Sequence, residues 1–220
     1  MLFRSLMDIK KAKRWKKLST NSKLILSTIA GLNLFAFIVI WAIEASNPLT
    51  LAPMSFGDQA LNAWFHATVP RSSGFNSLEV SSMSNASTLI TMVLMFIGGG
   101  SLSTAGGIKV GTFIIMILSV ITFLKRSDEI TVFGYSVSHQ ATFKALAVIA
   151  ITSLLILIGF FTLLILEPDK KFLDLLFEAV SAACTVGLSR GITENLHAGS
   201  QIALIRSEEH TSELQSPCNL

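Results

Sequence analysis

Charged residues are scarce in this chain: Asp, Glu, Lys and Arg make up 14% of its 220 residues, against about 25% in an average soluble domain. Cysteine is scarcer still, since only Cys184 and Cys218 occur. Two cysteines make no disulfide framework, and they have no metal-ligand spacing. The four histidines are scattered and also form no ligand pattern. These absences exclude a disulfide-stapled domain and a His/Cys metal centre.

Long apolar runs are what the chain has instead. Hydrophobic residues make up 51% of it, the mean hydropathy is +0.62, and nearly charge-free segments cover 24–45, 86–97, 108–124 and 145–166. A helix needs about 20 apolar residues to cross a bilayer, so 24–45 and 145–166 are long enough. A soluble protein with buried helices is the alternative, but it would need more polar surface. The pattern predicts an all-α, multi-pass protein of the plasma (inner) membrane.

Positive charge gathers at the N-terminus. Residues 1–23 carry eight cations and only one acid, Asp8; the cations are Arg4, Lys10, Lys11, Lys13, Arg14, Lys16, Lys17 and Lys23. A short basic flank beside a spanning helix marks the cytoplasmic side, so 1–23 is predicted to be a cytoplasmic basic segment. Binding to anionic lipid or to nucleic acid is the functional alternative. Topology alone accounts for the charges, and no nucleic-acid partner is predicted.

The two halves of the chain repeat one plan. In each half, a spanning segment is followed by a short amphipathic segment, at 58–69 and 172–184, that cannot cross the membrane. Each short segment leads into a glycine-centred strip, and Gly74 and Gly187 align at an offset of 113 residues. A new apolar segment follows each strip. The repeat predicts units of helix, re-entrant pore helix with filter loop, and helix, as in potassium channels.

The strips at 72–76 and 185–189 contain no carboxylate, so their main chemical resource is backbone carbonyl oxygen. A row of carbonyls can replace the hydration shell of a monovalent cation. Glycine suits such a row because the carbonyls must face one axis, and the C-terminal dipole of the short helix favours a cation. An ordinary glycine turn explains either strip alone. Two strips after two short helices favour a pore wall.

Three motifs resemble one family. Residues 185–189 (TVGLS) are similar to the potassium-channel signature Thr-Val-Gly-Tyr-Gly with its last two positions relaxed. Together with RSSGFNS at 71–77 and FIGGGSLSTAGGIKVGTF at 96–113, this strip resembles the Trk/Ktr/HKT superfamily of potassium-uptake proteins, in particular the Ktr-type membrane subunit. The resemblance covers about residues 1–205. In that family four helix–pore-helix–helix units of one chain surround a single pore, with one filter glycine per unit.

The resemblance implies that this chain carries the third unit at 24–126 and most of the fourth at 145–205, joined by a cytoplasmic linker at 127–144. The first two units are missing, as is the Arg that the family carries deeper in its last helix. Pro70 stands near a place where the family has Thr. The resemblance implies that a monovalent cation, potassium, is bound as substrate at the filter only, through Ser72, Ser73, Gly74, Phe75, Thr185, Val186, Gly187 and Leu188.

The segment 98–107 (GGGSLSTAGG) interrupts a membrane helix, because its five glycines and three hydroxyl residues cannot hold a stable helix in lipid. The resemblance implies an intramembrane gate below the filter, formed by Gly98, Gly99, Gly100, Ser101, Ser103, Thr104, Gly106 and Gly107, with Lys109 just beyond. A phosphate-binding loop is excluded by spacing. Helix packing through small residues is the alternative. Lys109 either snorkels to the cytoplasm or contacts gate carbonyls.

Four charged residues lie beside the strips. Arg71, Glu79 and Arg190 are predicted to be solvated at the outer mouth. Glu178 lies inside the second short helix, where a carboxylate must face water or a hydrogen-bonding partner behind the filter.

We therefore expect a truncated ion-translocating subunit of a Trk/Ktr-type potassium-uptake system, not an enzyme, with no covalently bound cofactor. The family implies a homodimer of complete chains in membrane lipid, on a cytoplasmic nucleotide-binding regulatory ring. A secondary transporter with broken helices and a midplane substrate site would show inverted repeats, whereas these halves run the same way. A membrane enzyme would need paired His, Asp or Glu within the spans. Sodium permeation, sodium dependence, the coupling ion and the regulatory nucleotide stay open.

The last fifteen residues depart from the pattern. The apolar run that restarts at Gln201 stops at Ile205, and 206–220 resembles a translated sequencing adapter. We interpret 206–220 as a non-native tail and expect the native helix to continue beyond Ile205. Met1 is interpreted as an internal start.

Overall fold

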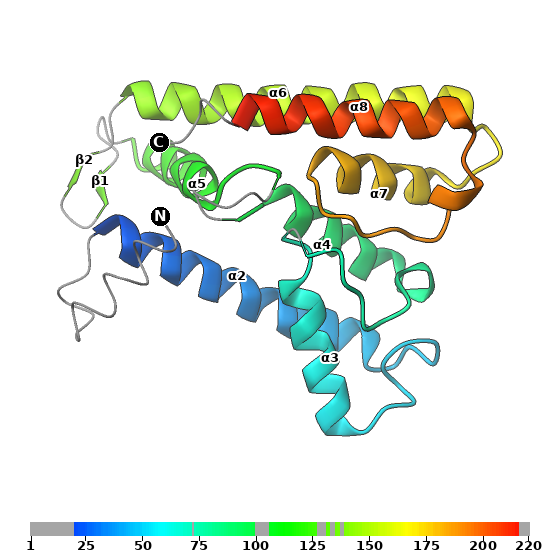
Figure 1. The fold of residues 1–220 in the computed structure, drawn as a ribbon. Coiled ribbons are helices and arrows are strands. Elements are labelled where there is room, and N and C mark those ends of the chain that lie inside the picture. Colours follow the sequence, from blue (N-terminus) through cyan, green and yellow to red (C-terminus); the bar gives the residue numbers. More distant parts are fainter. Residues whose placement is uncertain are drawn as a thin grey trace.

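The structure is a computed structural model that describes residues 20–71, 73–99, 106–126, 131–132, 135–136 and 139–215. The regular elements of the described chain are helices, apart from one antiparallel pair of two-residue strands, β1 (Thr131–Val132) and β2 (Tyr135–Ser136). The helices form two successive groups that lie against each other (Figure 1). The all-α expectation is therefore confirmed.

The first group contains α2 (Thr20–Glu44), the short α3 (Phe56–Thr68), and α4 (Asn85–Phe96) with its continuation α5 (Val110–Leu124). Serine caps begin two of these helices, because a hydroxyl can accept a hydrogen bond from a free amide of the first turn. Ser55 accepts from the Asp58 amide of α3 at 3.3 Å. Ser84 accepts from the Ser87 amide of α4 at 3.2 Å.

The second group repeats the first with α6 (His139–Leu166), α7 (Phe172–Ala183) and α8 (Ala198–Gln215). The elements that follow the two strips correspond to each other at the 113-residue offset. The 3-10 turn η2 (Val80–Ser82) corresponds to η3 (Thr193–Asn195), and the start of α4 at Asn85 corresponds to the start of α8 at Ala198. The short helices expected at 58–69 and 172–184 are present as α3 and α7.

Two boundaries extend past the expected segments. Helix α6 begins at His139, inside the segment assigned to the linker, because residues 139–146 contain neither Gly nor Pro to stop it. Its 28 residues are about 42 Å long at 1.5 Å per residue. Helix α8 continues to Gln215, through part of the segment interpreted as a tail. That interpretation stays a prediction, since a helix can run through any stretch of adequate propensity.

Helices α2 and α6 have the length and apolarity of membrane spans, with mean hydropathies of 2.2 and 2.8 over the spanning windows. Only 17% and 22% of the residues in those windows are buried, and large apolar side chains such as Phe35 on α2 and Phe161 on α6 are exposed. A soluble core helix would bury these side chains. Exposed apolar surface of this kind requires lipid or another apolar partner, so the soluble alternative is rejected.

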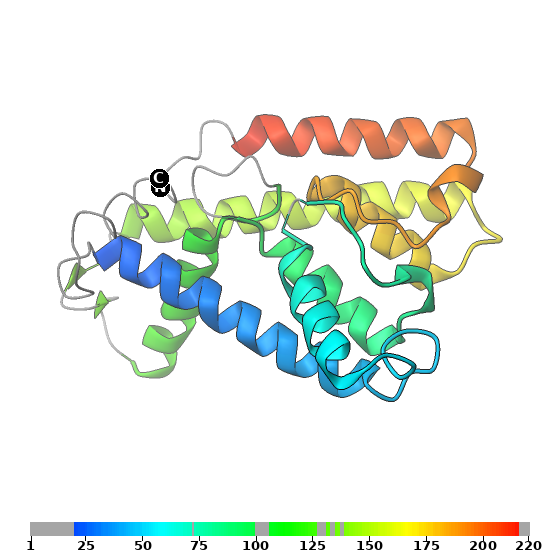
Figure 2. The same ribbon diagram turned by 60° about the horizontal axis from the view of Figure 1, so that its bottom comes forward.

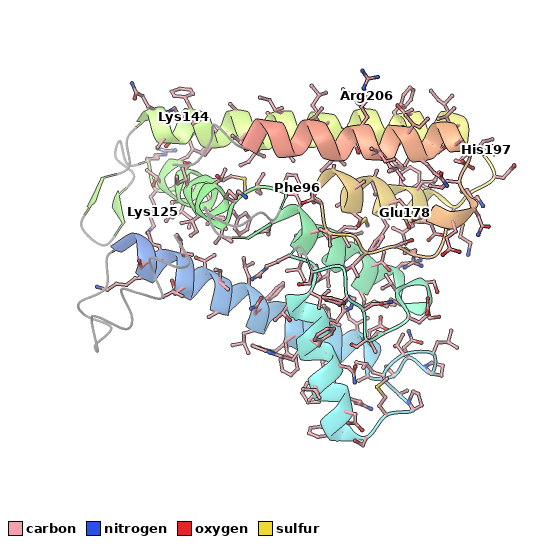
Figure 3. All side chains as sticks on the ribbon, viewed as in Figure 1. Phe96, Lys125, Lys144, Glu178, His197 and Arg206 are labelled. Carbon is pink, nitrogen blue, oxygen red and sulfur yellow. The ribbon has the colours of Figure 1, made fainter. Side chains whose placement is uncertain are left out.

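The arrangement places the two strips at the centre. In both views α6 and α8 run side by side, and α7 packs against both (Figures 1 and 2). Helix α4 contacts α7 from the first group and α2 within its own group. Lys125 and Lys144 lie at one end of the molecule, and His197 lies at the other (Figure 3).

Candidate functional site: two glycine strips and a broken helix

The two strips meet at their glycines. Gly74 has φ +65° and Gly187 has φ +81°, both in the left-handed region that glycine adopts without a steric penalty. A Cβ added to Gly187 would lie 3.5 Å from the Cα of Gly74. A Cβ added to Gly74 would lie 3.3 Å from the Val186 oxygen and 3.6 Å from the Gly187 oxygen. Thus the Val186 and Gly187 oxygens of the second strip lie close to Gly74 of the first strip.

The second strip turns sharply as it leaves α7. The Thr185 amide donates to the Ala182 oxygen at 2.9 Å, and the Val186 amide donates to the Ser181 oxygen at 2.9 Å. Thr185 itself has φ +51°, an uncommon value for a residue with a Cβ. Such a conformation persists only where its surroundings hold it. The geometry therefore indicates a strip whose backbone is held by contacts at both ends.

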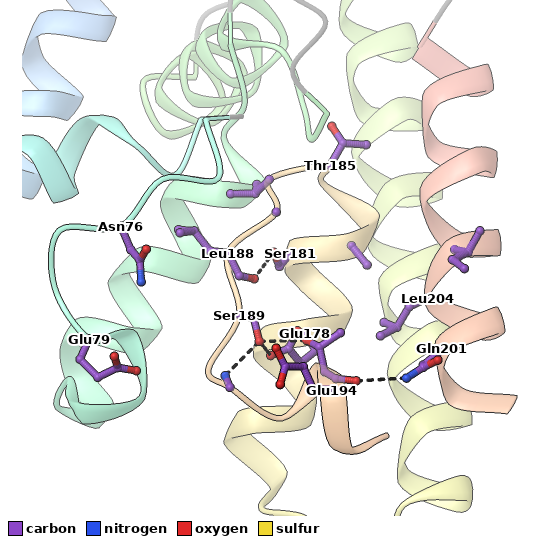
Figure 4. A pocket seen from close by; sticks show the side chains of 16 residues that line it. Asn76, Glu79, Glu178, Ser181, Thr185, Leu188, Ser189, Glu194, Gln201 and Leu204 are labelled. Atoms are coloured by element: carbon purple, nitrogen blue, oxygen red, sulfur yellow. Dashed lines mark hydrogen bonds between the residues drawn. The ribbon is translucent and has the colours of Figure 1, made fainter. Parts of the chain in front are cut away.

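Two side chains of α7 hold the strip from behind, as Figure 4 shows. The Ser181 hydroxyl donates to the Leu188 oxygen at 2.6 Å, which turns this carbonyl toward the helix. The buried Glu178 carboxylate accepts from the Ser189 hydroxyl at 2.7 Å and from the Arg190 amide at 2.9 Å. The expectation that Glu178 has a hydrogen-bonding partner behind the strip is confirmed. The Val186 and Gly187 oxygens, by contrast, lie beside Gly74 of the other strip.

A cavity of about 850 Å³ lies in front of the second strip, between it, the segment after the first strip, and α8 (Figure 4). Its walls are about as polar as they are apolar, because backbone and hydroxyl groups alternate with leucine and isoleucine. Glu79 and Glu194 place carboxylates along its rim. A water-accessible space beside backbone carbonyls and acidic side chains suits a cation.

Among the predicted residues of the first strip, the structure places Ser73, Gly74 and Phe75 in an exposed stretch, with Phe75 71% exposed. Ser72 lies outside the described residues. In the second strip, Val186 and Leu188 bury their side chains in the main core cluster while Gly187 is exposed. The two strips thus differ in burial, since the first is exposed whereas the second anchors Val186 and Leu188 in the core.

The predicted break in the membrane helix is confirmed, and its ends are joined. Gly98 donates to the Ile108 oxygen at 2.9 Å, and Ile108 donates to the Phe96 oxygen at 2.9 Å, in a parallel bridge between Ile97 and Ile108. Gly99 accepts from the Val110 amide at 3.2 Å. The predicted gate residues Gly100, Ser101, Ser103 and Thr104 lie outside the described residues. Gly98 and Ile108, on either side of these residues, lie next to each other.

The returning end of this loop contacts the second strip. The Gly106 amide donates to the Thr185 hydroxyl oxygen at 2.8 Å. A Cβ at Gly106 would collide with the Cys184 carbonyl, so only glycine fits there. Gly107 has φ +69°. Half-buried Lys109 caps the start of α5, and its two alternative roles stay open. Sequence reasoning placed loop and strip in one pore but missed this direct contact.

Arg190 corrects one expectation. Its side chain is 9% exposed rather than solvated, and its Nε forms a 2.7 Å ion pair with Asp174. Its Nη1 donates to the Thr88 hydroxyl at 2.6 Å and to the Val80 oxygen at 3.0 Å. Buried protein acceptors therefore replace its hydration shell, which is why it leaves the surface. Glu79 is exposed as expected.

Arg71 departs from the same expectation. Its side chain is half-buried, and its Nε and Nη2 atoms have no hydrogen-bond partner among the described residues.

Sequence reasoning also missed a repeated buried carboxylate. Glu44, at the end of α2, accepts from the Ser84 amide at the start of α4 at 3.0 Å. Glu167, just after α6, accepts from the His197 amide at the start of α8 at 2.6 Å and from the Ser200 hydroxyl at 2.8 Å. Ser84 and His197 stand 113 residues apart, so in each unit a carboxylate at or just after the end of the first helix is bonded to the start of the helix that follows the strip.

The hydrogen bonds to Glu167 stabilise its charged form. The His197 amide contributes most, and the pKa of the Glu167 carboxyl is lowered to about 2. A negative charge at the start of α8 also complements the helix dipole.

The fold and the site together define an all-α membrane protein with paired helix–short-helix–strip–helix units. The family model of TrkH, described as cation transport protein, matches residues 5–206. The chain belongs to the TrkH family of cation transport proteins.

Relatives of known name support the same assignment. The chain is 39% identical over 203 residues to Ktr system potassium uptake protein B of Bacillus subtilis, covering 92% of this chain and 45% of the relative. It is 34% identical to the protein of the same name from Vibrio alginolyticus, covering 88% and 43%. It is 33% identical to the potassium/sodium uptake protein NtpJ of Enterococcus hirae, covering 90% and 44%. The chain thus spans less than half the length of these relatives.

A solved structure shares the fold. The crystal structure of the potassium transporter TrkH from Vibrio parahaemolyticus superposes with a TM-score of 0.71 at 19% identity, over 89% of this chain and 45% of that one. This likeness establishes the fold alone. The membrane class and the family predicted from the motifs are confirmed.

Proposed function

We propose that the chain is the third unit and most of the fourth unit of a potassium-translocating subunit, in which carbonyl groups of the two strips bind the ion. The observation that carries this proposal is the meeting of the strips at Gly74 and Gly187, where the Val186 and Gly187 oxygens lie close to Gly74. Backbone carbonyl oxygens gathered in this way can take the place of water around a monovalent cation.

The substrate follows from the absence of side-chain charge in the strips. A divalent cation would call for carboxylate ligands, whereas a potassium ion is well served by neutral oxygens. Two of the relatives are named as potassium uptake proteins and one as a potassium/sodium uptake protein. We therefore propose potassium as the preferred ion and leave sodium as a competitor that the experiment must measure. The parallel order of the two units speaks against the alternative of an inverted-repeat secondary transporter.

We further propose that the segment 98–107 obstructs the path on the cytoplasmic side of the strips. Support comes from its joined ends and from the Gly106–Thr185 contact directly beneath the second strip. Since Gly98 and Ile108 are already bonded, deletion of residues 100–105 can close without displacing α4 or α5. We expect that deletion to raise potassium flux in a complete transporter. No gain in flux at normal membrane abundance would make the segment a packing kink.

Assembly is proposed by family resemblance: a homodimer of complete chains in the membrane, regulated by a cytoplasmic nucleotide-binding ring. The name "Ktr system" of two relatives fits a multi-component transporter. Co-purification of the complete membrane subunit with such a ring, and its mass in detergent, would test both parts of the assembly.

The decisive experiment compares the segment with the complete transporter, the longer protein that contains it. We expect the complete transporter to restore potassium uptake to a transport-deficient cell. Residues 1–205 alone should restore none, because two strips leave half of the ion's coordination shell unfilled. Uptake by the segment alone would contradict the four-unit pore, and a complete transporter that moves no potassium would contradict the proposed substrate.

A further inference from the structure

Arg190 is the first residue after the second strip, and its side chain leaves its own unit. The guanidinium reaches Val80, Ser81 and Thr88, which follow the first strip: Nη1 bonds Val80 and Thr88, and Nη2 donates to the Ser81 oxygen at 3.1 Å. Its Nε bonds Asp174 in the first turn of α7. One side chain therefore joins the short helix of one unit to the outer loop and second helix of the other.

These contacts make a specific clamp because of the shape of the guanidinium. It is planar and always charged, and its donors point in fixed directions, so it can hold several acceptors in one geometry. Here one acceptor is a carboxylate on its own unit and three are oxygens on the neighbouring unit. The side chain is 9% exposed and that of Asp174 is 16% exposed, so water competes little with the bonds to Asp174, Val80 and Thr88, whereas the bond to Ser81 is exposed.

The clamp acts where the strips end. Arg190 follows Ser189, whose hydroxyl is held by Glu178, and the Arg190 amide is held by the same carboxylate. On the other unit, Val80 lies six residues beyond Gly74. Relative movement of the two units at this level would have to break the Arg190 bonds before it could change the gap between Gly74 and Gly187.

We propose that Arg190 is a positioning residue that sets the gap between the two strips and thereby the preference for potassium over sodium. The proposal rests on the proposed function, since it assumes that the carbonyls of the strips bind the ion. Potassium is the larger ion and needs the carbonyls held apart. A gap that is free to close or to vary would admit sodium on more equal terms.

The test uses the complete transporter with Arg190→Gln, Arg190→Lys and Thr88→Val, and the control Lys125→Gln. The control also removes one positive charge, but far from Glu178, whose carboxylate binds the Arg190 amide (Figure 3). Uptake of potassium and sodium is measured over a range of concentrations, with membrane abundance determined for each variant. The potassium/sodium ratio of Vmax/KM is the readout, because a loss of folded protein lowers Vmax for both ions alike and leaves the ratio unchanged.

We expect Arg190→Gln to lower that ratio about tenfold, the equivalent of one charge-assisted hydrogen bond. The ratio for Arg190→Lys should lie between those of the wild type and Arg190→Gln, because lysine keeps the positive charge but lacks the planar set of donors of the guanidinium. Thr88→Val removes a single acceptor across the unit boundary and should shift the ratio in the same direction. Its effect should vanish in the presence of Arg190→Gln, because the two residues act through one bond.

Unchanged ratios in Arg190→Lys and Thr88→Val would refute the clamp, and these two variants decide the matter if Arg190→Gln fails to reach the membrane. An equal shift in Lys125→Gln would also refute it, since the effect would then be one of charge alone. A wild-type transporter that takes up no potassium would overturn the proposed function instead, which keeps the two failures distinct.

Discussion

Replacing Gly187 by Ala tests whether the second strip is a filter, and Gly191 supplies a matched control. Both glycines have φ +81°. An L-residue in this region costs about 1–2 kcal/mol, so both substitutions carry a similar backbone penalty. At Gly191 an added Cβ meets nothing within 4 Å, and at Gly187 the nearest atom is the Gly74 Cα at 3.5 Å, an ordinary contact. Neither variant therefore suffers a clash.

The two sites differ in what the backbone can disturb as it relaxes. Relaxation at Gly187 rotates the carbonyl oxygens that lie close to Gly74 of the first strip. Relaxation at Gly191 affects an exposed turn beyond the strip. A penalty of about 1–2 kcal/mol corresponds to a change of about 5- to 30-fold in an equilibrium constant, which bounds the expected loss of potassium affinity in Gly187→Ala.

The assay is potassium and sodium uptake by the complete transporter, together with its thermal midpoint in detergent. We expect both variants to lose similar stability and only Gly187→Ala to raise the potassium KM and lower the preference for potassium. Gly74→Ala should behave like Gly187→Ala and be more severe, because its Cβ would also lie 3.3 Å from the rigid Val186 oxygen. Equal transport effects at Gly187 and Gly191, or none at either, would remove these carbonyls from the ion path.

Three further outcomes are expected. Gly106→Ala should lower the free energy of unfolding by about 1–3 kcal/mol, because its Cβ overpacks against the second strip. The control Gly31→Ala, on the exposed face of α2 with nothing within 4 Å of its Cβ, should cost no stability. The thermal midpoint in detergent measures both, and equal midpoints would disprove the contact. The pKa of Glu167 is lowered from 4.5 to about 2 in the folded protein, so its contribution to stability is complete above pH 4.5 and is lost as the pH falls toward 2. Glu167→Gln should therefore make the thermal midpoint less dependent on pH between 4.5 and 2. An unchanged pH dependence in this variant would count against the role of Glu167. Single cysteines at Asn76 and Ser189, in a background without native cysteines, should react with an impermeant reagent from outside, and labelling from the cytoplasm alone would reverse the topology.

The short-range features of this protein were predictable from the sequence. Apolar runs of spanning length gave α2 and α6, because the bilayer sets how many apolar residues a crossing needs. Five glycines predicted the break between α4 and α5, since glycine is a poor helix former in any surroundings. The left-handed φ of Gly74 and Gly187 follows from the same local property. Each of these features depends on residues close together in the chain, so the local pattern contains the necessary information.

Only the tertiary structure decided which groups hold the strips in place. Arg190 bonds Val80 across 110 residues of sequence, and Gly106 bonds Thr185 across 79. From the sequence alone Arg190 is predicted to be a surface cation beside a polar loop. Its residue type and its sequence neighbours do not distinguish whether water or protein accepts its hydrogen bonds. The difference arises when α4 packs against α7 and brings carbonyl oxygens and a hydroxyl within reach. A charged side chain is buried only where enough partners converge, and that convergence is a property of the folded chain.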